Sequence, residues 1–201
     1  VPFDSCKSWI AKTWEMMAND EDSYENLLSA RGIQTQYGKL TNQTQSELDE
    51  AEIFPWQIYD RALEGEDQAV QVVEKIAQAL SELLYHRIRT LAVGAPETIL
   101  QGKDNALETE HDYLGKVFQR IVIGQRLGDI WEFKNFEPLL LDPVNEKLGR
   151  MIHGSDLPAD IKALYLTKTN RLRDDLILHS ELRHAPALGA GVDAYLNWIE
   201  Q

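Results

Sequence analysis

The stretch that decides the fold runs from Gln68 to Val93 and reads QAVQVVEKIAQALSELLYHRIRTLAV. Apolar residues recur in it every seven positions, at Val70, Ala77, Leu84 and Leu91. Five further apolar residues widen this stripe: Val73, Ile76, Leu80, Leu83 and Ile88. A broad apolar stripe at helical spacing predicts one long helix that is buried along a wide face. Gly94 and Pro96 follow directly and end the pattern.

Helical patterns also fill most of the remaining chain. We expect further helices over residues 5–17, 23–31, 56–63, 105–133, 142–154 and 158–182, and a short tail over 192–199. Thr44 and Glu47 have the spacing of a capping box at the start of one more helix, whereas the polar run GIQTQYGKLTNQTQ, residues 32–45, predicts a loop. Four glycines follow helical runs, where a left-handed C-cap residue is expected: Gly32, Gly65, Gly94 and Gly154. No stretch shows convincing strand alternation, so we expect an all-α bundle with its main core from the helices at 68–93, 105–133 and 158–182.

The composition limits the classes of function. A formal net charge of −13 argues against non-specific coating of nucleic acid, because the phosphate backbone repels such a chain. The single cysteine, Cys6, excludes an internal disulfide framework and a cysteine-based zinc site. No apolar run reaches membrane-spanning length, and Val1–Phe3 opens no secretory signal. We therefore expect a soluble, cytoplasmic protein.

The best candidate for a functional site is the stretch from Asn170 to His184, NRLRDDLILHSELRH. On a helix, His179 would lie at the edge of the apolar stripe, and Asp175 would reach its ring from four residues before. A carboxylate beside an imidazole fixes the tautomer of the ring and favours its charged form. The alternative is an ordinary surface ion-pair ladder with a structural histidine, and the residues alone leave both interpretations open.

The segment LRDDLILHS resembles the signature of the HEPN family, small helical bundles of prokaryotic defence systems, in which an arginine precedes a histidine near the end of a late helix. The signature maps onto Arg173, Asp174 and His179, with five residues between Arg173 and His179. Asp174 stands where the family commonly has asparagine. The resemblance covers residues 68–185, so we expect a HEPN-type bundle over 66–201 and an N-terminal helical extension over 1–65.

The resemblance implies an endoribonuclease that needs no metal or cofactor and acts in defence or as a toxin. In this role His179 would transfer protons during attack of a ribose 2′-OH on the RNA phosphate. Arg173 would stabilise the developing charge, Asp174 completes the motif, and Asn170, Arg171 and Asp175 would support the site. The family also implies a homodimer that joins two such sites in one cleft, and a cognate antitoxin, often nucleotidyltransferase-like. A local basic strip at Lys162, Lys168, Arg171, Arg173 and Arg183 agrees with RNA as substrate.

Two other classes of function stay open. A non-catalytic helical dimer or partner-binding protein would have nearly the same sequence pattern, and the acidic composition favours it. A di-metal carboxylate bundle would use two Glu-x-x-His pairs and two further glutamates. The pairs are Glu108 with His111 and Glu181 with His184, and the further glutamates would come from Glu74 or Glu82 and from Glu132 or Glu137.

Overall fold

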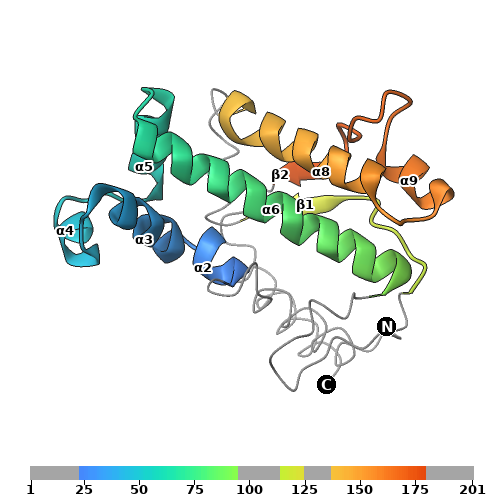
Figure 1. The fold of residues 1–201 in the computed structure, drawn as a ribbon, viewed down its shortest axis with the longest axis horizontal. Helices are drawn as coiled ribbons and strands as arrows, with labels where there is room; N and C mark the ends of the chain where they lie inside the picture. The colour runs from blue at the N-terminus through green and yellow to red at the C-terminus, as the bar shows by residue number, and fades with distance from the viewer. Residues whose placement is uncertain (1–22, 95–113, 125–136, 180–201) are drawn as a thin grey trace, which may run out of the picture.

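The computed structural model describes residues 23–94, 114–124 and 137–179, which form a mostly helical protein (Figure 1). The helices are α2 (Tyr24–Leu28), α3 (Ala30–Thr41), α4 (Gln45–Glu50), α5 (Pro55–Leu63), α6 (Asp67–Val93), the π-helical turn η4 (Glu137–Leu141), α8 (Asp142–Gly154) and α9 (Ala159–Tyr165). Two short strands, β1 (Ile121–Ile123) and β2 (Ile177–His179), complete the described elements. The all-α class is confirmed, with this small sheet as an addition.

The long helix α6 is the centre of the core, as its sequence predicts. Its 27 residues span about 40 Å at 1.5 Å per residue, and a broad face is buried from Ala69 to Leu91. The helices α2, α3 and α5 pack against it along one part of its surface, and η4 and α8 along another (Figure 1). One apolar cluster includes residues from both sides of position 65. The division of the chain at that position stays a prediction.

The expected loop over residues 32–45 is wrong, because most of it forms α3. Ser29 caps this helix by accepting a hydrogen bond from the amide of Gly32 at 3.1 Å. Two of the glutamines that suggested a loop instead donate side-chain hydrogen bonds inside the protein. Gln34 donates to the carbonyl of Ile53 at 2.8 Å, and Gln36 donates to the carbonyl of Leu27 at 2.9 Å. Buried amides with such partners are compatible with a helix.

Several predicted helix ends can be checked. The capping box of Thr44 and Glu47 at the start of α4 is confirmed, with both reciprocal hydrogen bonds present. Gly65 and Gly94 follow helices with positive φ values, 87° and 90°, but Gly94 has ψ of 167° and therefore lies outside the left-handed helical region. Gly32 and Gly154 instead lie inside α3 and α8, so the expectation that they cap helices was wrong.

The expected helix over 158–182 is also wrong beyond Tyr165. The helix α9 ends there, and the chain turns back in a tight hairpin in which Leu166 and Leu172 form an antiparallel bridge. Asn170 lies in the left-handed region at the tip, with φ of 59°, a conformation that asparagine adopts more readily than most residues. The chain then continues into β2.

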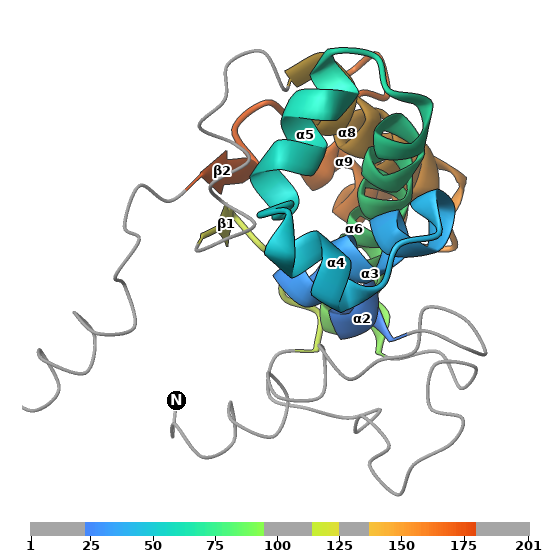
Figure 2. The same cartoon turned by 90° about the vertical axis from the view of Figure 1, so that its left-hand side faces the viewer.

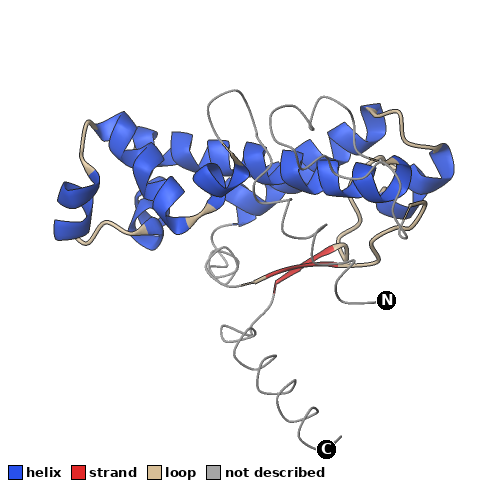
Figure 3. Ribbon diagram, turned by 90° about the horizontal axis from the view of Figure 1, so that it is seen from below, coloured by secondary structure: helices blue, strands red, loops and turns tan. Residues whose placement is uncertain are grey.

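Residues 114–124 were also expected inside a helix, over 105–133, and this expectation is wrong. They form an irregular segment and then β1, which pairs with β2 in parallel, Ile121 opposite Ile177 and Val122 opposite Leu178. The other residues of that expected helix, the expected helix over 5–17 and the tail over 192–199 lie outside the described residues. The two strands lie side by side on one side of the helical layer, at the left in Figure 2 and below the helices in Figure 3. Among the described helices, none combines the length and apolar character needed to cross a membrane.

Candidate functional site

The hairpin after α9 holds most of the predicted site residues. The amide of Thr167 donates to the carbonyl of Arg171 at 2.7 Å, and the amide of Asn170 donates to the carbonyl of Thr167 at 2.9 Å. The hairpin lies close against α8 at Gly149, where an added Cβ would come within 3.3 Å of the amide nitrogen of Leu172. Local hydrogen bonds and this close approach therefore fix the tip, Lys168 to Arg171, on the protein surface.

Arg173 is held by contacts within the protein. Its Nη1 donates to the carbonyl of Leu164 at 2.8 Å, and its Nε donates to Oδ1 of Asp175 at 2.9 Å. Its Nη2 makes longer contacts, 3.3 Å to Oδ2 of Asp175 and 3.4 Å to the carbonyl of Gln119. Every nitrogen of this guanidinium thus has an acceptor, which leaves it little capacity for a bidentate contact with phosphate.

Asp175 bridges two arginines. Besides its contacts with Arg173, it accepts a 2.7 Å hydrogen bond at Oδ2 from Nη1 of Arg120. The hydrogen bonds from Arg120 and then Arg173 lower the pKa of Asp175. Asp175 was expected beside His179 on one helix, and this expectation is wrong because residues 171–179 form no helix. Arg171 is exposed on the hairpin and has no ion pair within the described part of the chain.

The other predicted residues are spread over this region. Asn170 forms the tip of the hairpin, and Asp174 is exposed in the turn that leads to β2. His179 ends β2 opposite Ile123, and its side chain lies outside the described residues. The catalytic pairing of Arg173 with His179 stays a prediction.

Most candidate metal ligands lie outside the described residues: Glu108, His111, Glu132, Glu181 and His184. Glu74 and Glu82 lie on α6 and Glu137 begins η4. Within residues 23–94, 114–124 and 137–179, no three metal-ligating side chains gather in a cluster.

The hairpin and the two strands form one structural unit, which we call the β1–β2 unit and define as residues 114–124 and 165–179. Beyond the strand pairing, the amide of Phe118 donates to the hydroxyl of Tyr165 at 2.8 Å, and the amide of Ile121 donates to the carbonyl of Leu176 at 2.7 Å. Arg120 and Asp175 add the ion pair described above. These contacts join two segments that lie about 50 positions apart in the sequence.

An exposed apolar pair marks the surface of the β1–β2 unit. Val122 is 61% exposed and Leu178 is 37% exposed, and the two residues lie opposite each other in the parallel pairing. The neighbouring Ile123 is 7% exposed and belongs to the core, so β1 alternates between an inner and an outer face. Sequence reasoning missed this pair. The signal was the β-branched run RIVIG at 120–124 and the apolar run LILH at 176–179.

The β1–β2 unit is basic, although the whole chain is acidic. It carries five basic residues and two acidic ones, a formal charge of +3: Lys116, Arg120, Lys168, Arg171 and Arg173 against Asp174 and Asp175. Residues 23–94 carry six basic and eleven acidic residues, a formal charge of −5. Among the described residues, positive charge is therefore concentrated in the β1–β2 unit and negative charge in residues 23–94.

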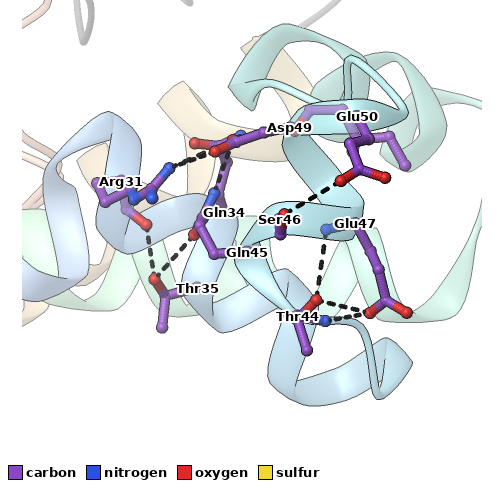
Figure 4. A network of polar contacts seen from close by, with 10 residues as sticks. Arg31, Gln34, Thr35, Thr44, Gln45, Ser46, Glu47, Asp49 and Glu50 are labelled. Atoms are coloured by element: carbon purple, nitrogen blue, oxygen red, sulfur yellow. Dashed lines mark hydrogen bonds and ion pairs between the residues drawn. The ribbon is translucent and has the colours of Figure 1, made fainter.

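A second polar cluster, between α3 and α4, has a structural role (Figure 4). Arg31 donates to Asp49 at 2.9 Å, and Gln34 and Gln45 donate to the same carboxylate at 3.2 and 3.0 Å. These hydrogen bonds, led by that from Arg31, lower the pKa of Asp49. The side chains of this cluster hydrogen-bond to one another, and these bonds join α3 to α4.

No family model matches the chain, and neither a curated protein nor a solved structure shows significant similarity to it.

Proposed function

We propose that this chain is a non-catalytic helical protein that binds another polypeptide through the β1–β2 unit. The observation that carries the proposal is the exposed pair Val122 and Leu178 on a sheet with only two strands among the described residues. Apolar side chains that gather on an exposed surface rimmed by charge are typical of protein-binding sites. The helices behind the sheet provide the rigid support that such a surface needs.

The contacts of Arg173 favour binding over catalysis. A catalytic arginine must keep donors free for the developing negative charge. Arg173 instead donates hydrogen bonds to Leu164, Asp175 and Gln119. Its geometry is that of a residue that stabilises the hairpin.

Photo-crosslinking from the proposed surface tests this function. p-Benzoylphenylalanine would replace Val122, and in a control it would replace Leu63, which is also apolar and exposed, at 38%, but lies on α5. In its native host, the protein labelled at Val122 should give a discrete adduct that protease destroys and ribonuclease leaves intact, and Leu178→Lys should remove that adduct. The control should give none. An absent adduct at Val122, or one that ribonuclease destroys, would contradict a polypeptide partner.

An endoribonuclease of HEPN type is the second candidate function, favoured by the charge of +3 on the unit that carries Arg173. In this proposal His179 accepts the proton of a ribose 2′-OH while the 2′-oxygen forms a bond to the adjacent phosphorus. The 5′-oxygen then leaves and is protonated, which yields a 2′,3′-cyclic phosphate. The active form would be a cytoplasmic homodimer with two such sites in one cleft, and a cognate antitoxin would restrain it.

A cleavage assay separates the two candidates. The nuclease should cut single-stranded RNA in the presence of a metal chelator and leave the cyclic phosphate. His179→Ala and Arg173→Lys should both abolish cleavage, since an ammonium lacks the planar fork of a guanidinium, and His184→Ala should retain it. Uncut RNA with the wild-type protein would remove this candidate.

A further inference from the structure

The sheet formed by β1 and β2 is incomplete by the ordinary standards of β structure. Parallel sheets are usually covered on both faces, and two strands alone are marginally stable. Here only two strands pair within the described residues, and the outer face carries Val122 and Leu178. A hydrophobic strand at an open edge is a template for pairing with another chain.

The hydrogen-bond pattern identifies the edge that is available. The amide of Ile121 donates to the carbonyl of Leu176, so the backbone of Ile121 faces β2. In a parallel ladder, alternate residues of a strand point their N–H and C=O groups to opposite sides. The backbone N–H and C=O of Val122 therefore point to the outer edge of β1, and the side chain of Val122 is the most exposed of the large apolar residues described.

The charge of the β1–β2 unit indicates what chemistry would fit this edge. Arg120 and Val122 lie two residues apart, so they share one face of the extended chain, and the side chain of Arg120 is 52% exposed although it is paired with Asp175. Lys116 and Arg171 are exposed in the same unit, whose formal charge is +3. An extended segment that alternates acidic and apolar residues would complement both the charge and the exposed valine.

Nucleic acid is a poorer match for the same surface. Proteins that bind single strands generally stack the bases on exposed aromatic rings. The aromatic residues of the β1–β2 unit are Phe118, which is half-buried, and Tyr165, which is buried. None of the exposed side chains in the β1–β2 unit is aromatic.

From these observations we infer that the outer edge of β1 receives an extended, acidic segment of a partner protein as an additional strand. The inference rests on the proposed function, and it specifies both the partner's chemistry and the mode of binding. Main-chain hydrogen bonds to Val122 would provide affinity, and the alternating side chains would provide specificity, as in other cases of strand addition.

Fluorescence anisotropy with defined peptides tests the inference. The probe is fluorescein-labelled Glu-Val-Glu-Val-Glu, and the comparison peptides are Lys-Val-Lys-Val-Lys and the acidic peptide with its central valine N-methylated. The acidic peptide should bind, and both comparison peptides should bind at least about tenfold more weakly. Val122→Lys should weaken binding of the acidic peptide to the same extent, whereas Leu63→Lys, a matched change on α5, should leave it unchanged. Added salt should weaken it as well.

Amide hydrogen exchange identifies the mode of binding. The amide of Val122 should exchange rapidly in the free protein and become protected when the acidic peptide binds. Protection of Val122 in the free protein would show that the edge is already filled and would overturn the inference. If the N-methylated peptide binds equally well, main-chain hydrogen bonds do not contribute to binding. That result would leave only charge attraction and would overturn strand addition. Preferred binding of the lysine peptide, or of oligouridylate RNA, would overturn the partner's chemistry.

The two levels of the proposal fail separately. If Val122 crosslinks a protein in the host while the acidic peptide does not bind the purified protein, the binding function stands and the acidic strand is wrong. If neither result is obtained, the proposed function fails as well.

Discussion

The guanidinium of Arg173 donates a 2.8 Å hydrogen bond from Nη1 to the carbonyl of Leu164, in the last turn of α9. The amide of Arg173 also donates to the carbonyl of Tyr165, the last residue of that helix, at 3.0 Å. The final carbonyls of a helix lack partners within the helix and carry partial negative charge. Arg173 thus serves as the C-terminal cap of α9, and Asp175 holds its guanidinium in place.

Replacing Arg173 with alanine should therefore destabilise the fold. We expect a loss of about 1–3 kcal/mol in the free energy of unfolding, because charge-assisted hydrogen bonds to main-chain carbonyls are removed. Arg171→Ala is the matched control, since Arg171 lies on the same hairpin but is exposed, and its effect should stay within about 0.5 kcal/mol. Urea denaturation of the two variants measures the difference. Equal effects would contradict the capping role of Arg173.

The sequence was sufficient to predict the centre of the fold. A heptad spacing sustained from Val70 to Leu91 specifies one helix and its buried face, because long periodic patterns depend little on distant contacts. The capping box at Thr44 was equally predictable, since all of its hydrogen bonds lie within four residues.

The prediction over residues 158–182 identified buried residues but assigned the wrong backbone. Tyr165, Leu172 and Leu176, which lie on one stripe of the expected helix, are all buried. Their spacing of seven and four fits a helix, but the hairpin and turn bury the same side chains through a different path. The local evidence against a helix was the run from Thr167 to Asn170, since threonine and asparagine favour turns and caps over helix interiors.

The candidate site depends on contacts that no local pattern could reveal. Arg120 and Asp175 are 55 positions apart, and they meet only because β1 and β2 pair in parallel. Short apolar runs such as those at β1 and β2 are ambiguous between helix and strand. The exposed pair of Val122 and Leu178 follows from this pairing, so it was beyond the reach of sequence periodicity.

Two glycines on α8 should respond differently to substitution by alanine. At Gly154 nothing lies within 4 Å of an added Cβ, so Gly154→Ala should stabilise the protein by about 0.5–1 kcal/mol through its effect on the unfolded chain. At Gly149 the new methyl group would press on the backbone of Leu172 at 3.3 Å. Gly149→Ala should therefore be less stable than Gly154→Ala by about 1 kcal/mol or more. Thermal unfolding compares them directly, and equal melting temperatures would argue against close packing of the hairpin on α8.

The half-buried His86 should make stability depend on pH. Burial, followed by the charges of Arg87 and Arg89, lowers the pKa of His86 from 6.5 to about 4, and the ring packs near Tyr24 and Tyr85. The unfolded chain therefore binds more protons than the folded chain between these two values. Stability should fall as the pH drops from about 7 to about 4.5, by roughly 1–2 kcal/mol.

A variant without a titrating ring isolates this effect. His86→Phe keeps an aromatic ring beside Tyr24 and Tyr85 and removes the proton-binding site. Below about pH 4 carboxylates with lowered pKa values, such as Asp49 and Asp156, contribute to acid unfolding in both proteins. The difference between wild type and variant should thus be confined to the range from about pH 4 to about pH 6.5. If the free energies of unfolding of the two proteins change in parallel over that pH range, His86 does not control the pH dependence of stability.

The neighbouring residues Val122 and Ile123 provide the last prediction, a test of the strand itself. Val122 points outward and is 61% exposed, so Val122→Lys should change the free energy of unfolding by no more than about 0.5 kcal/mol. Ile123 is 7% exposed, so Ile123→Lys should cost about 3 kcal/mol or more, because a charged amine would enter an apolar core. Val122→Lys should also reduce self-association at high concentration, since charge on an exposed strand edge prevents pairing between chains. Denaturation and light scattering measure the two effects, and similar losses at both positions would contradict the alternation of β1.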